Sequence, residues 1–95
     1  IDTAGTLTDA ARFLRQAGAQ QLIAAATHAV FSKPAAKRLS RSELSQVVVT
    51  DTVPISAKKR ERIGDRLHVI SVAPLLGDVI RRIHEGKSVG ELFNE

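Results

Sequence analysis

Three short apolar runs constrain the fold of this chain more than any other feature of its sequence. They span residues 21–26, 46–50 and 67–71, and Ala, Val, Ile and Leu dominate each of them. Their apolar residues are nearly continuous and do not alternate with polar ones, which is typical of strands buried on both faces of a parallel sheet. We therefore expect three parallel strands that are covered on both sides.

One helix is predicted before the first strand in the sequence and another after it. One spans residues 6–17, with Asp9 in its first turn, where the helix dipole favours negative charge, and Gly18 ends it. The other begins near Ser32, a candidate N-cap, with Pro34 in its first turn. Both would place an apolar stripe against the sheet.

A last helix is predicted from Pro74 to Gly86, because proline favours a first helical turn and glycine the position past a helix end. Residues 51–66 are less regular, since Pro54, Ser56 and Gly64 interrupt them, and we expect a loop there. The alternation of helices and strands predicts the α/β class, with a mainly parallel sheet flanked by helices. The apolar stripe of the last helix consists of Leu75, Leu76, Val79, Ile80 and Ile83.

Composition narrows the class of protein further. The 95 residues, 43% hydrophobic and 25% charged, suit one small globular domain. Cysteine is absent, which excludes a disulfide scaffold and a cysteine nucleophile. No apolar run approaches the roughly 20 residues that cross a bilayer, and no signal-peptide pattern is present. We expect a cytoplasmic location without a membrane partner. Because methionine is absent and the chain opens on a motif, we expect a fragment of a longer protein.

The chain carries a formal net charge of +4. Aromatic residues make up only 3% of it, with no Tyr or Trp to stack on bases, so nucleic acid is not favoured as a partner. A solvated face is the simplest interpretation of the one dense basic cluster. The alternative is that this cluster holds a phosphate group or a neighbouring subunit. It consists of Lys58, Lys59, Arg60, Arg62 and Arg66.

Polar residues follow each predicted strand, and ligands of open parallel sheets bind beyond the carboxyl ends of the strands. His28 is a candidate site residue there, with a structural histidine as the alternative. We interpret His68 and His84 as structural or surface residues. No His, Asp or Glu spacing indicates a metal site, and no catalytic residue is assigned. The polar residues after the strands are Thr27-His28, Thr50-Asp51-Thr52 and Ser71.

The segment Ile1-Asp2-Thr3-Ala4-Gly5-Thr6 runs directly into the first predicted helix. Its small residues let backbone N–H groups approach an anion, two threonines add hydroxyl donors, and the helix N-terminus adds unpaired N–H groups and a positive dipole end. The segment therefore predicts a cradle for a phosphate monoester. An ordinary helix start, capped by Thr6 or Thr8, is the alternative.

The same segment is similar to the last part of the D-D-x-I-D-T-A-G-T loop of ribose-phosphate pyrophosphokinases, also called phosphoribosyl pyrophosphate synthetases. The resemblance continues in order along essentially the whole chain. It includes an A-T-H-x-x-F-S segment at residues 26–32, V-V-T-D-T-[IV]-P at 48–54, a last helix at 71–76 and 80–84, and a tail at 88–89 and 92–93.

This resemblance implies a fold and an activity. The fold would be a tandem of type I phosphoribosyltransferase-like domains, with residues 1–95 as the later part of the C-terminal domain. The N-terminal domain and the start of the C-terminal domain would lie outside the chain. The parent would transfer the diphosphoryl group of ATP to ribose 5-phosphate, giving phosphoribosyl pyrophosphate and AMP. It would use Mg²⁺ bound mainly by residues outside this chain, and would form homo-oligomers, often hexamers.

The resemblance also assigns residues. Asp2, Thr3, Ala4, Gly5 and Thr6 would bind ribose 5-phosphate, with Asp2 beside the ribose. Ser88 and Phe93 fall on positions that help form an allosteric phosphate site in regulated members, whereas Gly90 stands where a serine is common, which weakens the case for ADP or phosphate regulation. A fragment holding part of one substrate site is expected to be inactive alone.

Two other classes remain as alternatives. A non-catalytic regulatory homologue of the synthetase tends to have a degraded ribose-phosphate loop, and the loop of this chain is intact. An ordinary phosphoribosyltransferase shares this type of loop, but the match from Thr27 to Phe93 argues against it.

Overall fold

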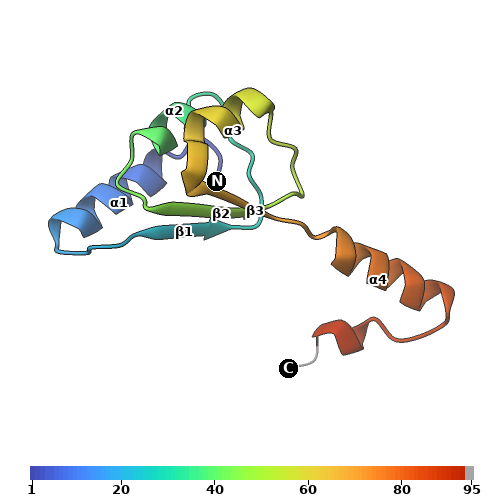
Figure 1. Cartoon of the computed structure of the whole chain (residues 1–95). Coiled ribbons are helices and arrows are strands. Elements are labelled where there is room, and N and C mark those ends of the chain that lie inside the picture. Colours follow the sequence, from blue (N-terminus) through green and yellow to red (C-terminus); the bar gives the residue numbers. More distant parts are fainter. Residues whose placement is uncertain (94–95) are drawn as a thin grey trace.

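The computed structural model describes residues 1–93 of the chain. The molecule is elongated, with extents of 52 × 31 × 20 Å, because its last helix projects from a body of helices and strands (Figure 1). In chain order the elements are α1 (Gly5–Gln16), β1 (Ile23–Ala26), α2 (Ala35–Ser40), β2 (Gln46–Thr50), α3 (Ala57–Ile63), the 3₁₀ turn η1 (Gly64–Arg66), β3 (Leu67–Ile70), α4 (Ala73–His84) and the 3₁₀ turn η2 (Gly90–Phe93).

The three strands form one parallel sheet in the order β1-β2-β3. Ala24 on β1 lies opposite Val47 on β2, and Val49 on β2 lies opposite Val69 on β3. The predicted α/β class and the predicted parallel sheet are therefore confirmed, and the carboxyl ends of all strands meet at one edge.

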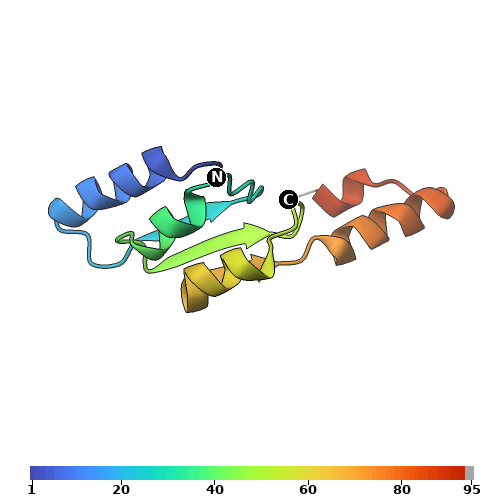
Figure 2. The ribbon, with the colours of Figure 1, turned by 90° about the horizontal axis from the view of Figure 1, so that it is seen from above.

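Helices α1, α2 and α3 lie on the same face of this sheet (Figures 1 and 2). Val47 and Val49 point into that layer and are fully buried, whereas Ile23 and Ile70 are 56% and 59% exposed. The prediction that both faces are covered is wrong for this chain. The reason is that three helices occupy one face and α4 leaves beyond the end of β3, so no element of residues 1–93 packs on the other face.

Residues 57–63 form a helix where a loop was predicted. The Ser56 side chain accepts a hydrogen bond from the Lys59 N–H at 3.3 Å, and Gly64, with φ of +78°, ends the helix. Ile63 is its one buried residue. Two of the three residues that suggested an irregular segment, Ser56 and Gly64, are thus the boundaries of a short helix.

The starts of the first two helices also differ from prediction. Because α1 begins at Gly5, Asp9 lies in the second turn, not the first. The position before α1 is Ala4, which has no side-chain cap, so neither threonine of the alternative interpretation caps this helix. The position before α2 is Pro34, also without a side-chain cap, and Ser32 contributes only its backbone carbonyl, which accepts from the Ala35 N–H at 2.7 Å.

Helix α4 has Pro74 in its first turn and ends just before Gly86, as predicted. Its apolar stripe, however, has no partner in residues 1–93. Leu76, Ile80 and Ile83 are 57%, 68% and 67% exposed, because α4 runs away from the sheet (Figure 1). No helix in the described part of the chain is long and apolar enough to cross a membrane.

Candidate functional site

The predicted phosphate cradle is a turn of residues 1–7 around a cavity of about 240 Å³. Ala4 adopts a left-handed conformation, with φ of 66° and ψ of 12°, and is 5% exposed. The Thr8 backbone N–H and hydroxyl both donate to the Ala4 carbonyl, at 3.0 and 2.7 Å, and so hold this uncommon conformation for a residue with a Cβ. When a left-handed residue precedes a right-handed helix, successive backbone N–H groups point to the same side. They then form an anion-binding concavity.

Three backbone N–H groups lie around this cavity. They belong to Gly5, Thr6 and Leu7, the first residues of α1, and helical geometry leaves them without an intrahelical acceptor. Only the Gly5 N–H has a local partner, the Thr3 Oγ1 at 3.5 Å, which is a long hydrogen bond. The turn thus presents free donors, and the Thr3 and Thr6 side chains are exposed beside them.

Hydrogen bonds tie the turn to the carboxyl end of β1. The Ile1 nitrogen donates to the His28 carbonyl at 3.0 Å, and the Val30 and Phe31 N–H groups donate to the Ile1 carbonyl at 3.0 and 3.1 Å. Arg38 of α2 donates to the Thr3 carbonyl at 3.2 Å. The turn is therefore fixed at the sheet edge where ligands of parallel sheets bind.

Gly5 leaves room for the Arg38 side chain beside the turn. A Cβ added to Gly5 would lie 3.1 Å from the Arg38 Nη1 and 3.7 Å from the Thr3 Oγ1. A larger side chain would press on the contact that positions the turn and would enter the space in front of the N–H groups. The structure brings all five predicted residues together around one cavity, namely Asp2, Thr3, Ala4, Gly5 and Thr6.

The other polar residues at the sheet edge bond mainly to one another. The His28 Nδ1 forms a hydrogen bond with the Thr52 Oγ1 at 2.8 Å, and the Thr50 hydroxyl donates to the Thr27 carbonyl at 2.6 Å. His28 thus has a structural partner of the kind that its alternative interpretation expects.

Asp51 links the ends of β2 and β3. Its carboxylate accepts from the Val72 N–H at 2.9 Å and from the Ser71 hydroxyl at 2.7 Å. These two hydrogen bonds, that of Val72 most strongly, lower the pKa of the Asp51 carboxyl below its ordinary value of 3.8. Sequence analysis placed Asp51 at this edge but missed its structural role. A serine directly after the next parallel strand was the available signal.

Residues 1–93 alone do not offer a site that fits magnesium. In residues 1–93, no three His, Cys, Asp or Glu side chains gather in a way that could hold a metal ion. Both oxygens of the Asp51 carboxylate already accept hydrogen bonds from protein groups.

The predicted allosteric residues lie in the tail, with α4, and the structure does not bring them to the turn of residues 1–7 (Figure 1). The Ser88 Oγ accepts from the Gly90 N–H at 3.1 Å, and Arg82 donates to the Ser88 carbonyl at 3.2 Å and to the Glu91 carboxylate at 2.8 Å. Phe93 is 63% exposed. The tail is thus anchored to α4 by Arg82.

The structure divides the basic cluster in two. Arg66 donates to the Leu39 and Ser42 carbonyls at 3.2 and 3.0 Å, and Lys59 donates to the Phe31 carbonyl at 2.7 Å. These two residues join the η1 and α3 region to α2 and its preceding loop. The other three members, Lys58, Arg60 and Arg62, are exposed.

Comparison with known proteins agrees with the resemblance seen in the motifs. The family model described as phosphoribosyl synthetase-associated domain matches residues 1–94. The ribose-phosphate pyrophosphokinase of Aquifex aeolicus is 50% identical over 93 residues, which cover 98% of this chain and 29% of the relative. That of Parasynechococcus marenigrum is 54% identical over 94 residues, which cover 98% of this chain and 28% of the relative.

A solved structure supports the same conclusion. The phosphoribosylpyrophosphate synthetase from Mycobacterium smegmatis superposes with a TM-score of 0.84 at 45% identity, covering 90% of this chain and 28% of that one. This chain therefore spans less than a third of the length of the relatives it matches. With the match over residues 1–94, the chain belongs to the phosphoribosyl synthetase-associated domain family.

Proposed function

We propose that this chain supplies part of the ribose 5-phosphate site of a ribose-phosphate pyrophosphokinase. The observation that carries the proposal is the turn of residues 1–7. In this turn the left-handed Ala4 precedes α1, whose free N–H groups lie around one cavity. Supporting it, relatives about 50% identical along nearly the whole chain are ribose-phosphate pyrophosphokinases.

In this proposal the 5-phosphate accepts hydrogen bonds from the N–H groups of Gly5, Thr6 and Leu7, and the Thr3 and Thr6 hydroxyls add two donors. The positive end of the α1 dipole favours the dianion. Asp2, which is exposed at the rim, lies beside the ribose. The turn thus holds one substrate by its non-reacting end and orients its sugar.

The whole protein would transfer the diphosphoryl group of ATP to ribose 5-phosphate, giving phosphoribosyl pyrophosphate and AMP. Phosphoryl transfer depends on positioning both reactants and on cations that stabilise the transferred charge. This chain contributes positioning of one reactant only. Residues outside it would bind ATP and supply most of the Mg²⁺ ligands. We therefore propose that residues 1–95 alone have no turnover.

We further propose that the whole protein is a cytoplasmic homo-oligomer, such as a hexamer, without a membrane or nucleic-acid partner. The exposed apolar stripe of α4 and the bare face of the sheet support the homo-oligomer, because large exposed apolar areas mark surfaces that other parts of a protein or other subunits cover. Ser88 and Phe93 would contribute to an allosteric phosphate site, with Gly90 supplying no hydroxyl there.

An assay of AMP release tests the assignment. The longer protein that contains this chain should form AMP from ATP only when ribose 5-phosphate is present, and residues 1–95 alone should form none. Release of diphosphate from phosphoribosyl pyrophosphate would instead identify a phosphoribosyltransferase. Absence of both reactions in the longer protein would identify the regulatory homologue. Clear AMP formation by the verified 95-residue chain would contradict the proposal that residues outside it are needed for catalysis.

A further inference from the structure

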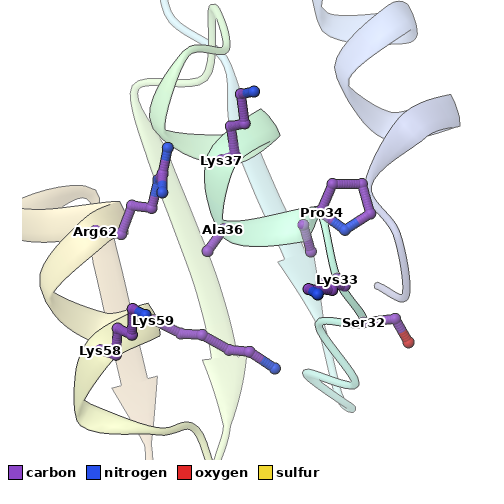
Figure 3. A pocket seen from close by; sticks show the side chains of 9 residues that line it. Ser32, Lys33, Pro34, Ala36, Lys37, Lys58, Lys59 and Arg62 are labelled. Carbon is purple, nitrogen blue, oxygen red and sulfur yellow. The ribbon is translucent and has the colours of Figure 1, made fainter.

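A second cavity, of about 410 Å³, lies between α2 and α3 (Figure 3). It shares no lining residue with the cavity of that turn. Small apolar groups of Pro34, Ala35 and Ala36 form part of its wall, and no carboxylate lines it. Five cationic side chains surround it, namely Lys33, Lys37, Lys58, Lys59 and Arg62.

The cationic side chains come from both sides of this cavity. Figure 3 shows Lys59 extending from α3 toward the loop that carries Lys33, and Lys37 and Arg62 projecting from α2 and α3. The Lys59 ammonium is held in place by the Phe31 carbonyl at 2.7 Å. Phe31 itself has φ of +47°, uncommon for an aromatic residue, so this hydrogen bond joins α3 to a turn of restricted geometry.

The charge of the cavity is uncompensated within the described residues. None of its five cations forms an ion pair with a carboxylate in residues 1–93, although arginines elsewhere in the chain do. Nine of the 14 Lys and Arg residues lie between positions 33 and 66. Like charges placed around one cavity repel one another, and an anion placed among them reduces that repulsion.

The arrangement favours an anion with several charges in a row. Lysine and arginine both bind phosphate oxygens well, lysine as a point charge and arginine with a planar pair of donors. One orthophosphate can contact only some of five cations that are distributed over two helices and a loop. We propose that the α2–α3 cavity binds a diphosphate or triphosphate chain, either free or as part of a nucleotide. This site goes beyond the proposed ribose 5-phosphate function and does not depend on it.

Titration of the 95-residue chain with inorganic tripolyphosphate, followed by backbone amide NMR, tests the proposal. We expect saturable shifts in residues 32–37 and 57–63. Lys58→Gln and Arg62→Gln should each weaken binding about tenfold, as expected for loss of one charge-assisted contact. Arg60→Gln is the matched control, because Arg60 lies on the same helix, is exposed and does not line the cavity. It should change the affinity by less than about twofold, because its charge acts only through screened solvent.

Two outcomes of the tripolyphosphate titration would overturn the proposal. One is equal weakening by Arg60→Gln and by the two cavity variants, which would show a diffuse charge effect and no site. The other is a linear, non-saturating response to tripolyphosphate. These variants replace exposed side chains, and unchanged amide spectra of the unliganded variants would show that the fold is retained.

Three further ligands identify the source of the phosphate chain. Orthophosphate should bind more weakly than tripolyphosphate. ATP should shift the same residues as tripolyphosphate, with tighter binding if the base also packs on Pro34 and Ala36. ATP shifts confined to residues 1–7 would contradict the proposal. Ribose 5-phosphate should not compete with tripolyphosphate, so failure of one site leaves the other testable.

Discussion

The turn of residues 1–7 and the α2–α3 cavity both suit an anion, but they offer it different groups. The turn offers backbone N–H groups of α1 and threonine hydroxyls, arranged by the left-handed Ala4. The cavity offers five cationic side chains, of which Lys59 is held by the Phe31 carbonyl. One site is therefore defined by backbone conformation and the other by charge.

Because of this difference, the two sites should respond differently to substitutions and to ionic strength. A backbone site tolerates little steric intrusion, because its donors cannot move away, and it binds a single well-oriented group. A side-chain site tolerates loss of one member but responds to ionic strength, since its binding energy comes from charges that solvent ions screen. Substitutions and salt should therefore separate the two.

The largest effect is expected from Gly5→Val in the longer protein that contains this chain. The valine side chain would press on Arg38, 3.1 Å from the new Cβ, and would block the N–H groups. The apparent KM for ribose 5-phosphate should rise about a hundredfold or more, since several charge-assisted contacts of about 1.5–3 kcal/mol each are lost. An unchanged KM for Gly5→Val would mean that the turn is not the cradle.

Thr6→Val should have a smaller effect at the same site. It removes one exposed hydroxyl at nearly constant volume and leaves the backbone donors in place. Loss of one donor to a phosphate should cost about 1–3 kcal/mol of ribose 5-phosphate binding. Steady-state kinetics of the same longer protein measures this cost. A wild-type KM would indicate that the hydroxyl does not contact the phosphate, and the N–H groups alone would then define the turn.

Salt concentration should change the binding affinities of the two sites by different but smaller factors. Raising the salt from about 50 to about 200 mM should weaken tripolyphosphate binding about fivefold, because the exposed cations of the cavity are screened. Ribose 5-phosphate binding should weaken less over this range, since its donors are dipolar groups in direct contact. Isothermal titration calorimetry at both salt concentrations checks this. Equal salt sensitivity would remove the contrast between a backbone site and a charge site.

Acid should act on the sheet edge where Asp51 links the ends of β2 and β3. The pKa of Asp51 is lowered in the folded chain, so its hydrogen bonds to Val72 and Ser71 stabilise the fold above its ordinary pKa of 3.8. This contribution is lost as the pH falls below that value through the lowered pKa. The free energy of unfolding should therefore decrease with acid near pH 4 and below, and by less in Asp51→Asn. Denaturant unfolding at stepped pH measures this small difference, and identical acid profiles would contradict it.

Local patterns in the sequence predicted much of this fold, and the misses have physical reasons. The apolar runs predicted the parallel strands, and Gly18 and Gly86 predicted where α1 and α4 end. Helix α3 was missed because Ser56 and Gly64, its caps, are also typical loop residues. The bare sheet face was missed because continuous apolar runs do not show whether the covering elements are present in the same chain.

The candidate sites show the same limit. All five residues of the turn could be selected from the sequence, but the left-handed Ala4 could not, since alanine rarely adopts it without support of the kind that Thr8 gives. Only part of the lining of the α2–α3 cavity could be predicted from the sequence. The sequence showed Lys58, Lys59 and Arg62 together, whereas folding is what brings Lys33 and Lys37 beside them.

The most direct test of the central claim is a titration of the 95-residue chain with ribose 5-phosphate, followed by backbone amide NMR. We expect the largest shifts at Gly5, Thr6 and Leu7, with little change in residues 57–63 and none of this response in Gly5→Val. Absence of saturable shifts in residues 1–7, or largest shifts between α2 and α3, would contradict the assignment of the turn as the ribose 5-phosphate cradle.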